Sequence, residues 1–145
     1  MTVLARFVEM INTHTLTNAH ELIDENIVEE GPIVVDAPTG GGLQTFLEGW
    51  TQMLESFPDI HIEVTDTITE GDRTAARISL QATNTGPYRR TQGTNTHATW
   101  TGILWLTTKG GKITHFAAMT DRLSILQQLG FIGTDDDLAE AVNSR

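Results

Sequence analysis

The 145-residue sequence contains no cysteine. This absence excludes a disulfide scaffold, thiol catalysis and a zinc site with cysteine ligands, and it is compatible with a reducing compartment. No apolar run approaches the length of a membrane-spanning helix, and the first residues lack the basic region, apolar block and small-residue cleavage site of a secretory signal. We therefore expect a soluble, cytoplasmic protein that does not act at a membrane.

Positive charge is also scarce. Nine Lys and Arg stand against 19 Asp and Glu, which gives a formal net charge of −10. Binding to a phosphate backbone is driven by Lys and Arg, so this deficit argues against nucleic acid or an anionic membrane surface as partner. Part of the negative charge serves solubility, and the run from Asp135 to Asp137 is interpreted as a helix cap or a frayed tail.

The length fits a single domain over residues 1–145, with a core large enough to need no disulfide or metal. A first helix ending between Asn12 and Thr15 is predicted by apolar residues at helical spacing, namely Leu4, Phe7, Val8 and Ile11. A second, short helix is predicted from Thr17 or Asn18 through Leu22 and Ile23.

The segment from Asn26 to Gly31 is expected to lead into Pro32 and a loop that ends at the triple glycine 40–42. Glycines beside a helix can cradle a phosphate, but no Lys-Ser/Thr pair follows, so a loop before the next helix is the simpler interpretation. That helix is predicted from about Leu43 to Ser56, with an inward face made of Phe46, Leu47, Trp50, Met53 and Leu54.

Four strands are predicted to follow. Ile60, Ile62 and Val64 alternate with polar residues, and Glu70 to Asp72 forms a turn. In the next strand, over residues 74–83, two faces compete, since Ala76, Ile78 and Leu80 alternate with Arg77, Ser79 and Gln81. The order of helices and strands predicts an α+β fold in which helices pack on one face of a curved antiparallel sheet.

The last two strands form a hairpin from Trp100 onward, followed by a helix that Thr120 or Asp121 caps and Gly130 ends. A type I turn with Gly111 in the left-handed region would pair residue 108 with 112. One face of the hairpin would then contain Trp100, Gly102, Leu104, Leu106, Thr114, Phe116 and Ala118. The other would contain Ile103, Trp105, Ile113, His115 and Met119, and because this face is also apolar we expect it to form a homodimer interface.

Three stretches carry a resemblance to a known family: GLQTFLEGWTQMLESFPD, EGDRTAARISLQATNTG, and GKI before DRLSILQQLG. From about Thr2 to Gly130 the sequence resembles the SnoaL-like polyketide cyclases, whose cone-shaped superfamily also contains ketosteroid isomerase, scytalone dehydratase and limonene epoxide hydrolase. The resemblance implies a sheet curled around helices to enclose an apolar pocket, usually in a homodimer. It also implies a cofactor-free aldol ring closure in which a buried aspartate is the general acid/base.

Aligned through Gly111, the family's catalytic positions carry no catalytic side chains here. The aspartate falls at Ala118, the histidine facing it at Leu104, a helix tyrosine at Ile11 and an asparagine at about Gly49. Aldol closure by the family mechanism is therefore disfavoured, although the pocket itself is expected. Its predicted lining is Ile11, Trp50, Trp100, Leu104, Phe116 and Ala118.

Three polar residues remain as candidates for proton transfer. Glu30 stands where many family members carry a pocket histidine, although Glu29 and Glu30 could simply solvate a turn. Asp121 is either a helix cap or a proton donor at the pocket mouth. Arg77 could join Glu30 or Asp121 in opening an epoxide, as in related hydrolases, if its side of the strand points inward.

His14, His20 and His61 fit surface positions, and no histidine pair has metal-ligand spacing, so no metal site is expected. The leading hypothesis is a cofactor-independent cyclase or isomerase that acts on a hydrophobic, polyketide-type secondary metabolite, as in antibiotic biosynthesis. Two alternatives are a non-catalytic protein that binds a small hydrophobic molecule, and a ring-modifying hydroxylase or epoxide-opening enzyme of the same family.

Overall fold

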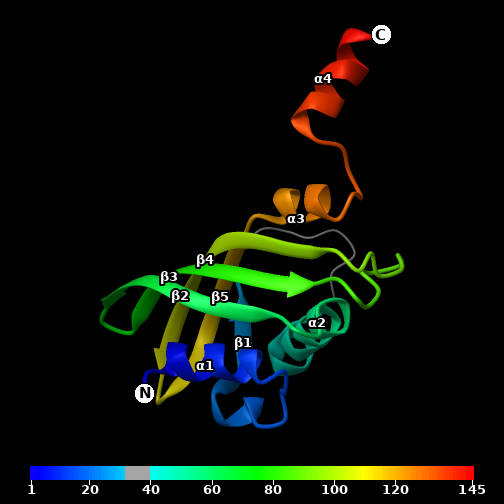
Figure 1. The fold of residues 1–145 in the computed structure, drawn as a ribbon. Coiled ribbons are helices and arrows are strands. Elements are labelled where there is room, and N and C mark those ends of the chain that lie inside the picture. Colours follow the sequence, from blue (N-terminus) through cyan, green and yellow to red (C-terminus); the bar gives the residue numbers. More distant parts are fainter. Residues whose placement is uncertain (32–39) are drawn as a thin grey trace.

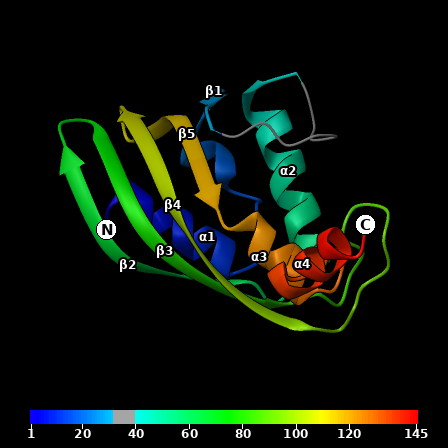
Figure 2. The same cartoon turned by 90° about the horizontal axis from the view of Figure 1, so that it is seen from above.

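A curved sheet of five strands forms the frame of the molecule, and helices α1 and α2 pack against its concave face (Figures 1 and 2). The computed structural model describes residues 1–31 and 40–145. The strand order is β1-β5-β4-β3-β2, and the sheet is not closed into a barrel. The elements are α1 (Val3–Asn12), the 3-10 helix η1 (Ala19–Glu21), β1 (Ile23–Glu29), α2 (Gly42–Ser56), β2 (His61–Glu70), β3 (Arg73–Thr83), β4 (His97–Lys109), β5 (Lys112–Thr120), α3 (Arg122–Gln128) and α4 (Asp135–Asn143).

The two N-terminal helices follow the predicted pattern. The Thr2 side chain caps α1 by accepting a hydrogen bond from the backbone N of Ala5 at 3.0 Å. The buried residues of α1 are the predicted ones, Leu4, Phe7, Val8 and Ile11. Helix α2 begins one residue before its predicted start and ends at Ser56 as predicted. Both helices are therefore amphipathic elements that turn one apolar face toward the sheet.

Strand β1 was not predicted. The helix expected through Ile23 is only the three-residue η1, and the segment expected to lead into Pro32 belongs to a strand up to Glu29. The loop predicted from Pro32 lies largely outside the described residues. Strand β1 pairs with β5 in parallel, with Ile23 beside Ile113 and Glu29 beside Phe116, which makes the sheet mixed rather than purely antiparallel. The charged and amide residues in β1 hide its pattern, since an edge strand with one neighbour tolerates polar residues that a central strand does not.

The two middle strands settle which side of β3 faces the core. Ala76, Ile78 and Leu80 are buried, and Arg77 is exposed on the opposite, outer face. In β2 Ile62 is buried, and Val64 lies on the same face beside Ile78, as the alternation predicted, although it is 38% exposed in this edge strand. A register shift after Val64 interrupts the β2–β3 ladder and turns the rest of β2 away from the core.

The hairpin of β4 and β5 has a shorter turn than predicted. Gly110 and Gly111 have φ angles of 59° and 79°, which fits a two-residue turn whose twist matches that of the strands. Lys109 therefore pairs with Lys112, and Leu104 with Ala118, so the predicted pairing of 108 with 112 is wrong. A bulge near Thr107 also moves Ile113 from the predicted outer face into the core, where it is fully buried.

An aromatic cluster fills the space between the two helices and β5. The ring of Phe116 lies 5.3 Å from that of Phe7 and 5.0 Å from that of Phe46, and Phe7 also meets Trp50 at 5.7 Å, measured between centroids. Tilted and edge-to-face pairs of this kind add to the hydrophobic effect of burial. We call Phe7, Phe46, Trp50 and Phe116 the packed end of the molecule.

The C-terminal segment extends beyond the sheet. Asp121 caps α3 by accepting a hydrogen bond from the backbone N of Ser124 at 3.0 Å. This agrees with the first of the two roles considered for it, a helix cap. The acidic run beginning at Asp135 is the first turn of α4, which Thr134 and Asp137 start with a capping box. Helix α4 has no buried residue and stands away from the rest of the chain (Figure 1).

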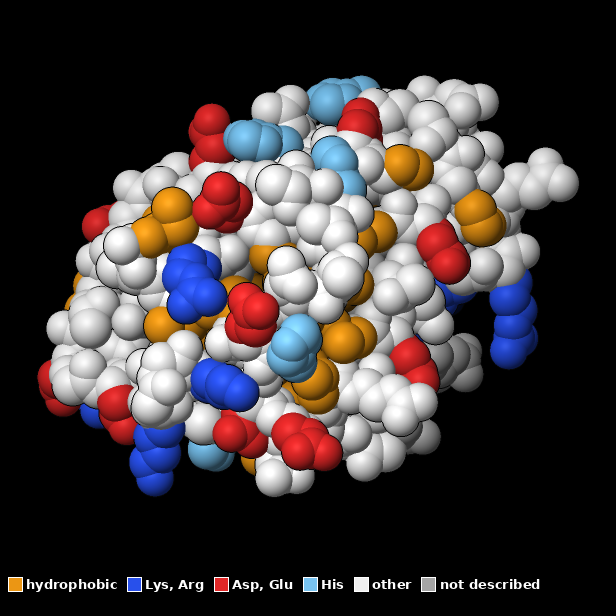
Figure 3. All heavy atoms as spheres, turned by 90° about the horizontal axis from the view of Figure 1, so that it is seen from below, with side chains coloured by type: hydrophobic (Ala, Val, Ile, Leu, Met, Phe, Trp, Pro, Cys, Tyr) orange, Lys and Arg blue, Asp and Glu red, His pale blue; other side chains and the backbone are white. Residues whose placement is uncertain are grey.

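The face seen from below in Figure 3 mixes acidic, basic and histidine side chains with small hydrophobic patches. Such a mixture is typical of a solvated surface. Among the residues that the structure describes, no helix has the length and apolar character needed to cross a membrane.

Candidate functional site at the open end of the sheet

The connection between β3 and β4 is held in place by one fully buried polar residue, Asn84. Its side-chain amide donates to the carbonyl oxygens of Ser56 and Gly86, at 3.1 Å each. Its side-chain oxygen accepts from the backbone N and the hydroxyl of Thr94, at 2.9 and 3.0 Å. A buried amide with all these partners fixes both ends of the connection against the end of α2.

Close packing tightens this attachment. A side chain at Gly86 would collide with the carbonyl oxygen of Glu55, so only glycine permits the approach. The hydroxyl of Ser56 donates to the carbonyl oxygen of Pro87 at 2.7 Å. The connection is therefore a positioned wall rather than a loose loop.

Tyr88, the only tyrosine in the sequence, projects from this wall. Its ring packs against Phe57 and Phe131, with centroids 6.2 and 5.8 Å away. Its hydroxyl oxygen accepts a hydrogen bond from Nε of Arg122 at 2.9 Å. Tyr88 thus joins the β3–β4 connection to Phe57 and Phe131 through ring packing, and to the start of α3 through the hydrogen bond with Arg122.

Around Tyr88 lie two adjoining hollows, which we together call the mouth cavity. The larger hollow, of about 550 Å³, is lined by Gln52, Glu55, Tyr88, Arg89, Arg90, Thr91, Leu126 and Phe131. The smaller hollow, of about 180 Å³, is lined by Gly49, Gln52, Met53, Ser56, Tyr88, Arg89, Thr120, Arg122 and Ile125. Gln52, Tyr88 and Arg89 line both hollows, so these three residues stand where the hollows meet.

A tight turn presents two arginines to the mouth cavity. The backbone N and the hydroxyl of Thr91 both donate to the carbonyl oxygen of Tyr88, at 3.0 and 2.6 Å. Arg89 and Arg90 occupy the tip of this turn, and Arg89 has a φ of 54°. A left-handed conformation is unfavourable for a residue with a side chain, and such residues are often found at functional sites.

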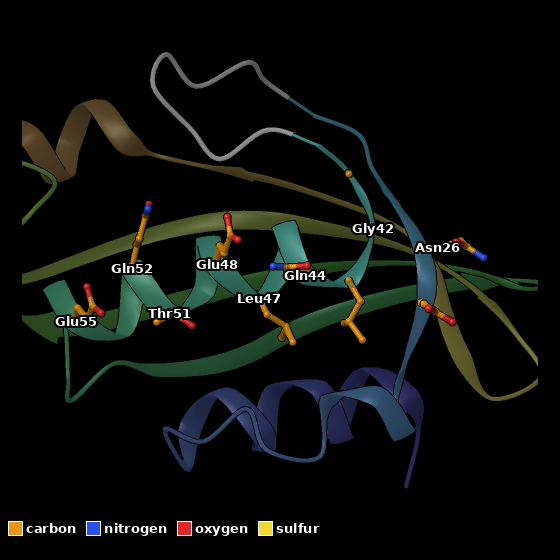
Figure 4. Close-up of a pocket in the computed structure, with 11 residues that line it drawn as sticks. Asn26, Gly42, Gln44, Leu47, Glu48, Thr51, Gln52 and Glu55 are labelled. Atoms are coloured by element: carbon orange, nitrogen blue, oxygen red, sulfur yellow. The ribbon is translucent and has the colours of Figure 1, made fainter.

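A longer groove runs along α2, with a volume of about 990 Å³ (Figure 4). Its acidic residues are Glu25, Glu48 and Glu55, and its polar α2 side chains are exposed to solvent. Among its described lining residues there is no cation and no aromatic ring. We therefore consider the mouth cavity, which has both, the better candidate for a site.

The predicted pocket residues gather on the inner face of the sheet. Leu104 and Ala118 are direct partners across the β4–β5 ladder, which confirms that they share a face. Ile11, Trp100, Leu104 and Phe116 are buried, and Trp50 and Ala118 are partly buried against the same core. None of these six is among the described residues that line the mouth cavity.

The three predicted proton-transfer residues lie in different places. Glu30 is exposed just after β1, where its backbone N donates to the carbonyl oxygen of Phe116 at 2.7 Å. Asp121 caps α3, and Arg77 lies on the outer face of β3, with β4 and β5 between it and β1. The structure therefore does not bring Arg77 together with Glu30.

Glu29 differs from its neighbour Glu30. It pairs with Phe116 in the parallel ladder, so its side chain is directed to the same face as that of Phe116. Glu29 is exposed like Glu30, but partial burial of its carboxyl group raises its pKa above the usual value. Glu29 is thus solvated, as the alternative interpretation expected, but it lies in strand β1 rather than in a turn. Within the described ranges, no group of three or more His, Asp or Glu side chains could hold a metal ion.

Tyr88 and Arg122 were missed by the sequence analysis. One signal was present, since PYRR places an aromatic residue and two cations in an otherwise polar connection of a chain poor in positive charge. The partner Arg122 carries no such signal, because its bond to Tyr88 spans 34 positions of sequence.

Comparison with known proteins agrees with this architecture. The model of the SnoaL-like polyketide cyclase family matches residues 1–129. Among curated proteins, no sequence matches the chain. Solved structures share the fold at low identity. AclR from Streptomyces galilaeus, a proposed hydroxylase, superposes with a TM-score of 0.78 at 22% identity, covering 98% of this chain and 88% of its own.

Two further structures carry the cyclase name. IdmH from Streptomyces antibioticus, a proposed polyketide cyclase, gives a TM-score of 0.75 at 24% identity over 88% of this chain and 96% of its own. A SnoaL-like polyketide cyclase from Agrobacterium tumefaciens gives 0.71 at 16% identity over 89% of this chain and 98% of its own. At such identities the likeness establishes the fold alone.

Proposed function

Because the chain belongs to the SnoaL-like polyketide cyclase family, we propose that it is a cofactor-independent cyclase or isomerase. Its substrate in this proposal is a hydrophobic, polyketide-type secondary metabolite, and the reaction takes place in the mouth cavity. The observation that carries the proposal is the hydrogen bond from Arg122 to the hydroxyl of Tyr88, at a point where the cavity's two hollows meet.

Tyr88 is suited to hold a substrate oxygen. Since the oxygen of its hydroxyl accepts from Nε of Arg122, the hydroxyl hydrogen remains to be donated to a ligand. When a carbon nucleophile adds to a carbonyl group, negative charge develops on the carbonyl oxygen. A fixed donor at that oxygen stabilises the transition state more than the ground state.

Shape supplies the remainder of the proposed catalysis. The cavity walls are tied together by Asn84 and Ser56, so they can hold a flexible substrate chain in a folded conformation. Glu30, Asp121 and Arg77 are not among the described residues lining this cavity. We therefore assign the proton balance to exchange with water through the open mouth, and the rate to positioning and to Tyr88.

The alternative functions rest on separate observations. A non-catalytic binder is favoured by the apolar pair Leu104 and Ala118, which stands where the family resemblance implies a histidine and an aspartate. A hydroxylase is suggested by the fold shared with AclR. Opening of an epoxide by Arg77 and a carboxylate is disfavoured, because Arg77 lies on the outer face of the sheet.

We also propose that two copies pair through the outer face of the sheet. Ile103, Trp105 and Met119 lie on this face and are 53%, 47% and 62% exposed. Large apolar residues grouped on one side of a sheet are typical of an interface. Sedimentation of the wild type should give twice the monomer mass and that of Trp105→Lys the monomer mass, whereas a wild-type monomer would contradict the pairing.

The function is tested with the variant Tyr88→Phe. Turnover of a linear poly-β-ketone substrate, followed by mass spectrometry of the cyclic product, should fall by about 10- to 100-fold, in line with the loss of one oxyanion donor. Substrate affinity, measured by quenching of tryptophan fluorescence, should change less, because the donor acts chiefly in the transition state.

Thr69→Val is the matched control, since it removes a hydroxyl from the exposed strand β2 and should leave turnover unchanged. Equal turnover by wild type and Tyr88→Phe would contradict the role of Tyr88. Saturable binding with no product from any poly-β-ketone would favour the non-catalytic alternative.

A further inference from the structure

We propose that the mouth cavity selects ligands that join an apolar body to one anionic group, a carboxylate or a similar oxyanion. The inference deepens the proposed function, and rests on it in taking the ligand of this cavity to be the substrate. It assigns the anionic group to Arg89 and Arg90 and the apolar body to the wall formed by Leu126 and Phe131.

Positive charge is concentrated at this place. Arg89, Arg90 and Arg122 line the mouth cavity, and they are three of the seven arginines in a chain whose net charge is −10. The described lining contains a single carboxylate, Glu55. The negative net charge of the chain repels anions from most of its surface. The three arginines make the mouth cavity a local exception that attracts them.

The arginines hold different places in the cavity wall. Arg122 donates through Nε to Tyr88, and its guanidinium lies 5.9 Å from the Tyr88 ring centroid, so it stiffens the wall. Arg89 and Arg90 sit at the tip of the turn that Thr91 closes on Tyr88. Guanidinium groups bind carboxylates through paired hydrogen bonds, which suits two arginines at one rim.

The apolar side of the cavity is continuous with the fold. The ring of Phe131 packs on Tyr88, which in turn packs on Phe57. Leu126 and Phe131 are only partly buried, so they present apolar surface to the hollow. A cavity with an aromatic wall and a cationic rim excludes ligands that lack either part, and this is the basis of the expected selectivity.

The test uses two dyes that differ in one group. Fluorescence titration at low salt compares 1-anilinonaphthalene-8-sulfonate with N-phenyl-1-naphthylamine, which has the same rings and no sulfonate. Wild type should bind the sulfonate at least about tenfold more tightly than the neutral dye. The double variant R89Q/R90Q should lose about 10-fold or more in affinity for the sulfonate while keeping its affinity for the neutral dye.

Lys112→Gln removes a charge at the hairpin turn, away from the cavity, and should leave both dyes unaffected. Near-ultraviolet circular dichroism of each variant ensures that the dyes report a folded protein. Equal binding of both dyes by wild type, or an undiminished preference in R89Q/R90Q, would overturn the inference. Dye binding needs no turnover, so a failed catalytic test with Tyr88→Phe would leave this result standing, and the reverse also holds.

Discussion

The concave side of the sheet has two ends built on opposite principles. At the packed end, four aromatic rings from α1, α2 and β5 lie within 6.3 Å of a neighbour, measured between centroids. At the mouth cavity, hydrogen bonds of Tyr88, Arg122 and the buried Asn84 organise an opening that Arg89 and Arg90 also line. We therefore expect the first end to contribute mainly to stability and, under the proposed function, the second to recognition.

The contrast also explains how a family fold can keep its shape while its chemistry changes. The packed end depends on volume, which many apolar residues supply, and Leu104 and Ala118 on the same face of the sheet bear no polar group. The mouth depends on particular donors and acceptors, since replacing one of them leaves its partner unsatisfied. Substitutions at the mouth should thus alter binding first, and those at the packed end stability first.

The largest effect is expected for Phe116→Ala. Phe116 is 4% exposed and its ring contacts those of Phe7 and Phe46, so its loss should lower the free energy of unfolding by about 3–5 kcal/mol. Phe131→Ala at the mouth should cost less, because that ring is only partly buried. Urea unfolding measures the change in the free energy of unfolding for both variants. An equal or greater loss for Phe131→Ala would contradict the proposed difference between the two ends.

A smaller effect, of opposite sign, is expected for Gly49→Ala. Gly49 lies within α2 and lines the mouth cavity, and a Cβ placed there would meet no atom within 4 Å. Alanine should therefore stabilise the helix by about 0.5–1 kcal/mol. Gly102→Ala is the control, because its Cβ would lie 2.6 Å from Cγ2 of Thr120 and should destabilise the protein. A loss of thermal stability in Gly49→Ala would contradict the prediction and show that the mouth is already tightly packed.

The smallest effect concerns the pH dependence of stability. Burial raises the pKa of Glu29 in the folded state, so folding favours its protonated form. The contribution of Glu29 is fully present below its unfolded pKa and is lost as the pH rises through the folded pKa. Glu29→Gln should therefore flatten the decline in stability above pH 4.5, measured by urea unfolding at several pH values. Identical slopes for wild type and Glu29→Gln would contradict the assignment.

Periodicity predicted the elements that bury one clear face. Leu4 to Ile11 and Phe46 to Leu54 repeat at helical spacing, and Ala76 to Ala82 alternate as a strand, and all three segments were assigned correctly. Strand β1 was missed because its register depends on β5, almost at the other end of the chain. The predicted hairpin register was wrong because two adjacent glycines permit either a two-residue turn or a longer one. The local sequence does not decide between these two turns.

The site was harder to predict than the fold. The inward position of Leu104 and Ala118 followed from the alternation of the hairpin, and the structure confirms it. Tyr88, Asn84 and Arg122 lie in or beside segments without periodicity, where only tertiary contacts give a residue its role. Hydrogen bonds over 28 and 34 positions leave no local signature in sequence.

The parallel pairing of β1 with β5 has a consequence for the order in which the chain can fold. Ile23 can pair with Ile113 only after Ile113 has been synthesised, 90 residues later. At common rates of synthesis this delay is about 5–18 s. During that interval the apolar residues of β1 have no neighbouring strand. Asp24 and Glu25, which obscured the strand in the sequence, keep the waiting segment charged and so protect the nascent chain from association with others of its kind.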